Sequence, residues 1–452
     1  MKFKSLAAIL LAALSLHGLP KAMAQEAGNE GQAEQQTIIL AGNVLRPDGL
    51  SFAGPATITV RDGQIASVVR GISDTASLPD GVEIIDLSRS WVLPGLVDSH
   101  VHITTQRDES EKDDALNRTV ADRALRGAVY AERTLQAGFT TIRNLGGGEP
   151  VGALKDAIND GSLPGPTIID AGSMISITAG HGDVNGYAPD ITTFFSSQQE
   201  SVCDGADDCR RAVRSQIRAG ADVIKFAATG GVNSNVAGGL GQQMFEDEMS
   251  AIIETAHMFG RKVAAHAHGK SGIDMALRLG VDSIEHGTFA DAESIRLFRQ
   301  SGAYLVPTLL APTTVLQLVE DGKMSPATEV KIRQAAAVSY DNLGAALRAG
   351  VKIAFGTDSG VSAHGINAQE FAIMVRLGMS PEQAIQSATV NAADLLGISD
   401  RIGSIEQGKD ADIIAIAENP LENIRALENV SFVMRRGIVH RENGRALHFS
   451  SE

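Results

Sequence analysis

The segment PGLVDSHVH, residues 94–102, opens a series of apolar strand-like segments and ends in two histidines. Alternate side chains of an extended strand share one face, so His100 and His102 are expected to point the same way. Two neutral imidazoles that converge from a stiff strand make half of a divalent-metal site. A His-x-His pair is weak evidence by itself, so its meaning depends on whether matching ligands recur downstream.

From this segment onward, strand-like and helix-like segments alternate. The strand-like segments lie near residues 96–102, 139–144, 166–171, 222–228, 262–268, 282–286, 303–309 and 352–358. Helical spacing follows, as in residues 121–136, 246–259, 292–299 and 329–348. This alternation predicts an α/β protein with a (β/α)8 TIM barrel over residues 94–400, rather than a doubly wound sheet. In a TIM barrel the active site lies at the carboxyl ends of the strands.

The two flanks of this region have a β-rich pattern instead. Residues 37–93 read as short strands separated by turns such as Arg61-Asp62-Gly63, and residues 401–452 resume that pattern. Each flank is too short to bury a core of its own. Together they predict a small composite β-sandwich formed from both chain ends.

The first residues have the features of a secretion signal. Lys2 and Lys4 precede an apolar run, and Ala22-Met23-Ala24 resembles a cleavage site. We therefore expect residues 1–24 to be a signal peptide and residues 25–36 to be a polar, disordered leader. The mature protein is expected to be periplasmic or secreted.

Charge and cysteine content limit the partners and the compartment. The formal net charge of -15 argues against nucleic acid and anionic membrane surfaces as partners. No segment after the leader reads as a transmembrane helix. Cys203 and Cys209 are the only cysteines. In an oxidising compartment they are candidates for a short-loop disulfide, with two free thiols as the alternative.

Polar residues stand at the ends of several predicted strands. They are His100, His102, Lys225, His266, His268, His286 and Asp358. Singly, each has an ordinary explanation: Lys225 can snorkel to solvent, His286 can be a core histidine and Asp358 can cap a helix. Their joint occurrence at the same end of one barrel predicts a shared site.

Lys225 is the most informative of these residues because it lies inside an otherwise apolar strand. Burial lowers the pKa of a lysine, and its neutral amine can then add carbon dioxide to become a carbamate. A carbamate can bridge two cations roughly 3.5–4 Å apart. With imidazoles and a carboxylate beside it, this residue predicts two divalent ions, with zinc favoured.

These motifs resemble the amidohydrolase superfamily. The order of the strand-end residues is similar to its binuclear-metal subtype, and the segments ATVNAA (388–393) and GSIEQGKDAD (403–412) resemble its usual ending. The segments SITAGHGD (176–183) and HAHG (266–269) resemble its prolidase-like branch, which includes dipeptidases and ochratoxin-hydrolysing amidases. One departure is Asn144, which stands where relatives commonly carry Asp after Arg.

The resemblance implies a set of ligands for each of two ions. His100, His102 and Asp358 would hold the first ion, and His266 and His286 the second. Lys225, modified to N6-carboxylysine, would bridge the two. His268 would contact the substrate carbonyl, although the sequence leaves open a swap between His266 and His268.

The chemistry implied is hydrolysis of an amide or peptide bond in a small dipeptide or N-acyl amino acid, ochratoxin-type amides included. Two cations would share a hydroxide that attacks the carbonyl, with Asp358 and His268 as the catalytic side chains. The candidate substrate-binding residues are His181, Asn233, His364 and Arg143. For Arg143 the alternative is that it braces a neighbouring acid. By analogy with the family, the protein is expected to be a homo-oligomer.

Two other functions compete with this interpretation. The first is a mononuclear imidazolonepropionase-like or deaminase-like hydrolase of cyclic C–N bonds, whose sites need no bridging lysine. The second is a non-catalytic scaffold that keeps the fold but has lost its ligands. Lys225 argues against the first, and the complete set of expected ligands argues against the second.

Overall fold

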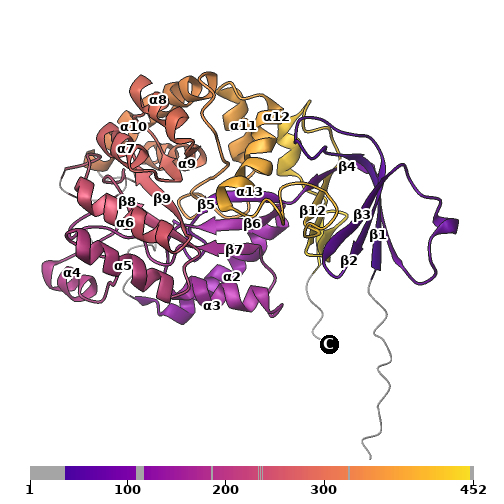
Figure 1. Ribbon diagram of the computed structural model, residues 1–452, viewed down its shortest axis with the longest axis horizontal. Helices are drawn as coiled ribbons and strands as arrows, with labels where there is room; N and C mark the ends of the chain where they lie inside the picture. The colour runs from indigo at the N-terminus through magenta and orange to yellow at the C-terminus, as the bar shows by residue number, and fades with distance from the viewer. Residues whose placement is uncertain are drawn as a thin grey trace, which may run out of the picture. The chain divides into compact units, whose positions relative to one another are not determined.

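The computed structural model describes residues 36–107, 117–184, 187–232, 234, 236, 238–323 and 326–447 (Figure 1). The expected signal peptide and all but the last residue of the leader lie outside the described residues, as does Asn233. The chain from Gln36 onward is one compact unit, so the proposed domain boundaries stay predictions. Within the described part of the chain, no helix combines the length and apolar character needed to cross a membrane.

One sheet combines strands from both chain ends (Figure 1). In spatial order its strands are β15 (Arg445–Ala446), β14 (Ile438–Glu442), β13 (Phe432–Arg435), β12 (Ile413–Ile416), β4 (Glu83–Pro94), β1 (Gln36–Val44), β2 (Ala56–Arg61) and β3 (Gln64–Arg70). A core of aliphatic side chains from both ends of the chain, including Ile58 and Ile413, stabilises it.

The strands expected to form a composite β-sandwich from both chain ends make one hydrogen-bonded sheet. The reason is the length of β4, which has 12 residues. Its first part pairs with β1 in parallel, and its last residues, Trp91–Pro94, pair with β12 in antiparallel fashion. One long strand thus joins the strands of both chain ends.

The middle of the chain forms parallel strands. One sheet has the order β5 (Leu96–Val101), β6 (Phe139–Asn144) and β7 (Thr167–Asp170). The other has the order β11 (Tyr304–Val306), β10 (Ser283–His286), β9 (Lys262–Ala267) and β8 (Val223–Ala227). Isolated parallel bridges join Phe226 of β8 to Ile175, Leu305 of β11 to Ile353, and Val101 of β5 to Ser359. The second residue of each pair lies outside the named strands.

The predicted eighth strand, residues 352–358, is absent as a strand among the described residues. Its place is marked only by the isolated bridges of Ile353 and Ser359. Asp358 has φ +57°, a left-handed conformation that interrupts an extended strand. The same conformation turns this residue out of the strand direction at the edge of the candidate site.

Helices connect and cover the parallel strands, as expected for an α/β fold (Figure 1). The helices are α2 (Val120–Gln136), α3 (Glu149–Asn159), α4 (Pro189–Ser196), α5 (Ala206–Arg218), α6 (Glu246–Met258), α7 (Lys270–Arg278), α8 (Ala292–Ser301), α9 (Leu310–Glu320), α10 (Pro326–Arg348), α11 (Gln369–Arg376), α12 (Pro381–Ser387) and α13 (Val390–Leu396). Short 3-10 turns occur at Thr75–Ser77 and Ile424–Glu428. Cys203 and Cys209 form a disulfide at the start of α5.

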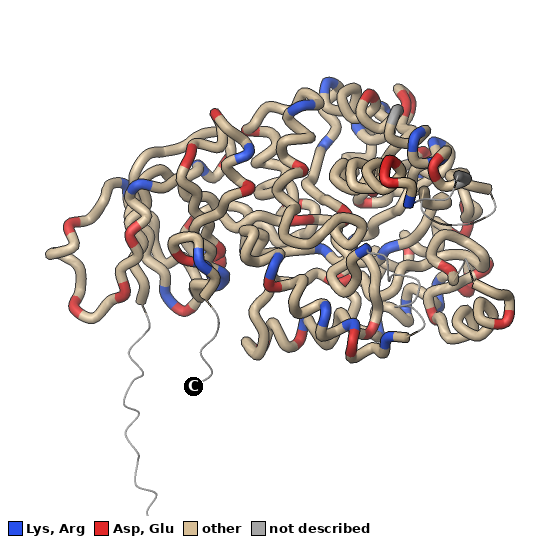
Figure 2. Tube along the Cα trace, turned by 180° about the vertical axis from the view of Figure 1, so that it is seen from behind, with Lys and Arg blue, Asp and Glu red and all other residues tan. Residues whose placement is uncertain are grey.

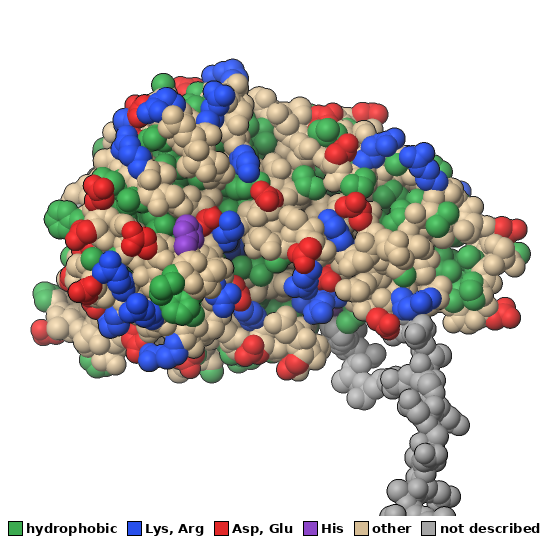
Figure 3. Space-filling model, viewed as in Figure 1, with side chains coloured by type: hydrophobic (Ala, Val, Ile, Leu, Met, Phe, Trp, Pro, Cys, Tyr) green, Lys and Arg blue, Asp and Glu red, His purple; other side chains and the backbone are tan. Residues whose placement is uncertain are grey.

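Acidic and basic side chains are interspersed along the chain (Figure 2). On the face shown in Figure 3, Lys and Arg side chains lie close to Asp and Glu side chains, with hydrophobic side chains scattered between them.

Candidate metal centre

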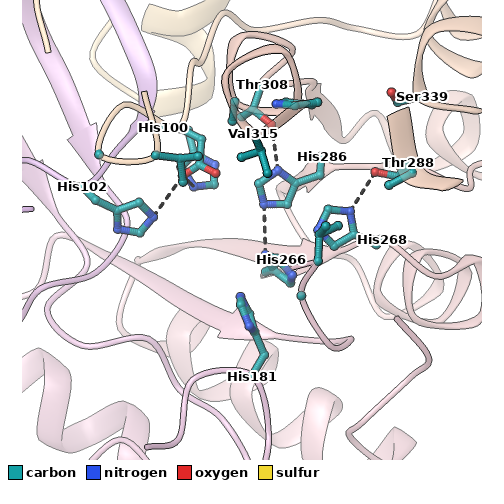
Figure 4. Close-up of a pocket in the computed structure, with 18 of the residues that line it drawn as sticks. His100, His102, His181, His266, His268, His286, Thr288, Thr308, Val315 and Ser339 are labelled. Carbon is teal, nitrogen blue, oxygen red and sulfur yellow. Dashed lines mark hydrogen bonds and ion pairs between the residues drawn. The ribbon is translucent and has the colours of Figure 1, made fainter. Parts of the chain in front are cut away.

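Side chains from the ends of four parallel strands meet in one cavity of about 330 Å³ (Figure 4). The polar residues predicted for the site that line it are His100, His102, His181, Lys225, His266, His268, His286 and Asp358. They come from β5, β8, β9 and β10 and from the segments that follow β5, β7, β9 and α10. Parallel strands bring their carboxyl ends to one side, which is why residues distant in sequence meet here.

Two groups of side chains have their potential ligand atoms within 4.8 Å of one another. They are His266, His268 and His286 in one group, and His100, His286 and Asp358 in the other. His102 joins the second group, because its Nε2 lies 3.2 Å from Asp358 Oδ1. His286 belongs to both groups and therefore lies between them.

The spacing of the donor atoms fits the ligands of metal ions. His286 Nε2 lies 3.0 Å from His266 Nδ1, and His100 Nε2 lies 3.4 Å from Asp358 Oδ1. Two ligands of one tetrahedral zinc ion, each about 2.0 Å from it, are roughly 3.3 Å apart. The residues present therefore suit divalent ions.

Backbone strain is concentrated at two of these residues. His286 has φ +72° and Asp358 has φ +57°, a region that non-glycine residues rarely adopt. Such conformations cost about 1–3 kcal/mol each and persist where the surroundings impose them. Both strained residues face the cavity, so the fold accepts a loss of stability to aim these two side chains.

The ring orientation of three histidines is set by neighbours that the sequence analysis missed. His100 Nδ1 lies 2.8 Å from Glu285 Oε2. His268 Nδ1 lies 2.8 Å from Thr288 Oγ1, and His286 Nδ1 lies 2.7 Å from Thr308 Oγ1 (Figure 4). Each contact leaves Nε2 directed at the cavity. A partner on the second ring nitrogen fixes the tautomer of a metal-binding histidine. An acid beside His286 in a buried strand was the one signal that could have pointed to Glu285.

Arg143 does not occupy the substrate-binding position considered for it. Only 1 % of it is exposed, and it is not among the described residues that line the cavity. Its Nε donates to the Ser99 carbonyl at 2.6 Å, Nη1 to Ser283 Oγ at 3.0 Å and Nη2 to Glu285 Oε1 at 2.9 Å. All three guanidinium nitrogens thus donate hydrogen bonds to groups inside the protein. One of these bonds holds Glu285, the acid that orients His100.

Lys225 has the surroundings that its proposed modification needs. The residue is 2 % exposed, and burial, followed by the positive charge of Arg143, lowers its pKa to about 8. Glu285 and Asp358 act in the opposite direction. Its Nζ has no hydrogen-bond partner among the described residues. A buried amine without a partner and with a lowered pKa is costly unless something binds it.

The imidazoles are held in the neutral form that binds metals. Burial lowers the pKa of His100 and of His181 to about 4 and that of His268 to about 3. It also lowers the pKa of His266 and of His286 well below the ordinary value. A histidine must be neutral to coordinate a metal ion, so these residues are ready to bind without losing a proton.

The other two candidate substrate-binding residues that the structure describes, His181 and His364, lie in different places. His181 lines the cavity, with its ring 4.1 Å from that of His266. His364 is placed elsewhere: its Nε2 donates to the Thr105 carbonyl at 2.8 Å, and its ring stacks on Tyr130. It is not among the described residues that line the cavity, so the structure corrects the substrate role considered for it.

Asn144 is also part of the framework. Its side-chain oxygen accepts a hydrogen bond from the Ile103 backbone, and its amide donates to Gly146 and Asp170. These bonds tie the end of β6 to the segment after β5. The departure from the family pattern therefore falls on a residue that holds two loops together.

Part of the cavity lining is apolar. Ala311, Pro312 and Val315 from α9 and Ile332 and Ala335 from α10 line it. We call these five residues the apolar wall. Sequence analysis did not find it, because its members come from two helices whose apolar residues read as ordinary core.

Comparison with known proteins places this architecture in a family. The Amidohydrolase family matches residues 91–440, which include the parallel strands and every described residue of the site. The chain belongs to the Amidohydrolase family.

Individual relatives are similar over most of the chain. A solved structure of a Xaa-Pro dipeptidase with methionine bound in its active site is 38% identical, with a TM-score of 0.84, over 90% of this chain and 100% of that one. Ochratoxinase of Aspergillus niger is 33% identical over 411 residues, 87% of this chain and 83% of that protein. The imidazolonepropionase of Thermoplasma volcanium is 25% identical over 405 residues, 81% of this chain and 85% of that protein.

Proposed function

We propose that this protein is a binuclear metal-dependent amidohydrolase that cleaves the amide bond of small dipeptides or N-acyl amino acids. The single observation that carries the proposal is Lys225, a buried lysine whose Nζ has no hydrogen-bond partner among the described residues and which lines the same cavity as two groups of potential ligands. The similarity to a Xaa-Pro dipeptidase and to an ochratoxinase supports the substrate class. Ochratoxin-type amides are therefore candidates.

The ligands divide into two sets in this proposal. His100, His102 and Asp358 hold one ion, and His266 and His286 hold the other. Carboxylated Lys225 is shared between the two. The 3.0 Å separation of His266 Nδ1 and His286 Nε2 favours His266 over His268 as the ligand. Zinc suits this set of nitrogen and oxygen donors.

When bound, divalent ions lower the pKa of water to near neutrality and polarise a carbonyl group. The chain supplies the remaining steps. Burial alone would raise the pKa of Asp358, but His100 and His102 hold it below its ordinary value. Asp358 is therefore an ionised base that can accept a proton from water and pass it to the leaving nitrogen. His268 donates a hydrogen bond to the oxygen on which negative charge develops.

The rest of the cavity fits the two halves of such a substrate. Arg107 lines it and carries the positive charge that suits the free carboxylate of an amino acid. His181 also lies within reach of a substrate. The apolar wall suits an apolar acyl or side-chain group.

Three further features belong to this proposal. The two parallel sheets and the bridges between them are the parts of a (β/α)8 barrel. The N-terminal segment directs the chain to the periplasm or the exterior, and its oxidising conditions suit the disulfide at Cys203 and Cys209. The enzyme works as a homo-oligomer on small molecules, not on nucleic acids or membranes.

The test is a hydrolysis screen of Xaa-Pro dipeptides, Xaa-Phe dipeptides and N-acyl amino acids, with zinc and bicarbonate supplied and metal content measured. We expect cleavage of amides and two ions per chain. One ion per chain would support the mononuclear, imidazolonepropionase-like alternative. Cleavage of lactones or phosphotriesters alone would overturn the substrate class, and an inert metal-loaded protein would support the scaffold.

A further inference from the structure

The turn between β11 and α9 lies next to both the histidines and the apolar wall of the cavity. Thr308 in this turn contacts His286 Nδ1 at 2.7 Å through Oγ1 (Figure 4). Ala311 and Pro312, a few residues further along, begin the apolar wall. A displacement of this turn would therefore move the partner of a candidate metal ligand and the surface that faces the substrate at the same time.

The helix that follows this turn has no side-chain cap at its N-terminal residue. Thr308 has φ +50°, which a β-branched residue rarely adopts. Leu309, the residue that precedes α9, makes no side-chain hydrogen bond that caps the helix. The first backbone N–H groups of a helix have no partner within it, so they need an acceptor from elsewhere.

Glu370 on α11 is that acceptor. It is fully buried, and its two carboxylate oxygens accept hydrogen bonds from the backbone N–H groups of Leu309, at 2.8 Å, and Leu310, at 2.6 Å. Burial raises the pKa of Glu370 to about 8, although the two backbone hydrogen bonds act in the opposite direction. One carboxyl group, about 60 residues away in sequence, thus fixes the turn at the residues that follow Thr308 through these two hydrogen bonds.

We propose that Glu370 is a positioning residue that sets two properties of the site through this turn: the orientation of His286, by way of Thr308, and the place of the apolar wall, which selects substrates with a large apolar acyl group. The selectivity part rests on the proposed function, whereas the part about His286 does not. Glu370 itself is not among the described residues that line the cavity.

The chain contains a matched control for this carboxylate. Glu248 on α6 is also buried, and its two oxygens accept hydrogen bonds from the backbone N–H groups of Gly205, at 2.7 Å, and Phe245, at 2.8 Å. It therefore also binds backbone N–H groups at helix N-termini, namely those of α5 and of its own helix, α6. None of these three residues lines the cavity that contains the histidines.

The first experiment compares Glu370→Gln with Glu248→Gln. In each variant an amide NH2 replaces one acceptor oxygen, so one backbone hydrogen bond is lost. The loss of folding stability should therefore be similar in the two variants. We expect comparable decreases in melting temperature. Only Glu370→Gln should bind zinc about 10–100-fold more weakly in a titration of the metal-free protein, because the partner of His286 has moved. Hydrogen exchange at Leu309 and Leu310 should also become faster in that variant.

The second experiment measures selectivity with N-acetyl-alanine and N-(4-phenylbutanoyl)-alanine. The wild type should prefer the phenylbutanoyl substrate, and Glu370→Gln should reduce the ratio of the two kcat/KM values about tenfold, while Glu248→Gln leaves it unchanged. A tenfold change in this ratio corresponds to one well-placed apolar contact.

A third pair of variants tests whether Glu370 acts through Thr308. Thr308→Val removes the hydroxyl and should weaken zinc binding, whereas Thr308→Ser keeps the hydroxyl and should not. In the double variant Glu370→Gln/Thr308→Val, the loss of zinc affinity should be no greater than in Thr308→Val alone, because both changes break the same link.

Additive losses, or equal zinc affinity in Glu370→Gln and Glu248→Gln, would overturn the link to His286. An unchanged substrate ratio in Glu370→Gln would overturn the link to the apolar wall. If the wild type cleaves neither amide, the proposed function and the selectivity fall together, and the zinc titrations and the hydrogen exchange still decide the role of Glu370 at His286.

Discussion

The sheet built from both chain ends and the parallel strands of the middle region bury different kinds of side chain. In the former, the core is aliphatic, with residues such as Ile39, Ile58 and Ile413 fully buried. In the latter, Lys225 and Glu285 are buried at strand positions. Burying charge is costly, and burying aliphatic groups is favourable. Aliphatic burial stabilises both regions, since Ile224, Val263 and Ile284 of the parallel strands are also fully buried, but the second region gives up part of this stability for chemistry.

The largest effect on activity is expected from Lys225→Ala, which removes one of the buried charged groups of the second region. If the lysine joins two ions, its loss removes several kcal/mol of transition-state stabilisation, and kcat/KM should fall by about 10³-fold or more. Metal content should fall below two ions per chain. Lys262→Ala is the matched control, because this lysine is exposed at the opposite end of the neighbouring strand β9 and pairs with Asp282. Full activity in Lys225→Ala with one ion per chain would place the protein with the mononuclear enzymes.

A smaller effect is expected from Glu285→Gln. Burial alone would raise the pKa of Glu285, but the charge of Arg143 and the hydrogen bond with His100 lower it to about 2, so the group is ionised at neutral pH. The amide loses that charge, and kcat/KM and zinc affinity should each fall about 10–100-fold. Kinetics and zinc titration measure this, with Glu293→Gln as control, because this glutamate is partly exposed and pairs with Arg278 and Arg296. If zinc affinity were unchanged, Glu285 would be only a structural partner of Arg143.

The smallest effect on activity is expected from Ile58→Ala in the composite sheet. The side chain is fully buried among aliphatic neighbours, so its truncation should lower the free energy of unfolding by about 2–5 kcal/mol. Ile58→Val should cost about 0.5–1.5 kcal/mol. Denaturant unfolding gives these values, and kcat/KM at a permissive temperature should stay within about twofold of the wild type. A large loss of activity without a loss of stability would show that the two regions are coupled.

Much of the candidate site could be predicted from the sequence because the relevant signals are local. The two-residue period of a strand places His100 and His102 on one side, and the position of each polar residue at the end of an apolar segment marks the carboxyl edge. The α/β class followed from the alternation of strand-like and helix-like segments along the chain. Lys225 was conspicuous for the same reason, as a charged residue within an apolar strand.

Where the sequence analysis was wrong or incomplete, the deciding contacts join distant segments. Arg143 could be a substrate ligand or a brace, and only its bond to Glu285, 142 residues away, decides for the brace. His364 follows the predicted eighth strand, where a substrate-binding residue is expected, but its ring stacks on Tyr130. The union of both chain ends in one sheet depends on β4 being long enough to pair with β1 and with β12.

The sequence by itself determined the α/β class, the family and the side chains that meet at the strand ends, because periodicity and motif order depend on neighbouring residues. Only the tertiary structure decided which groups orient those side chains. Glu285, Thr288 and Thr308 face their histidines, and Glu370 reaches the start of α9, through packing between strands and helices. Such contacts need a geometry fixed by the whole fold, and no local pattern encodes it.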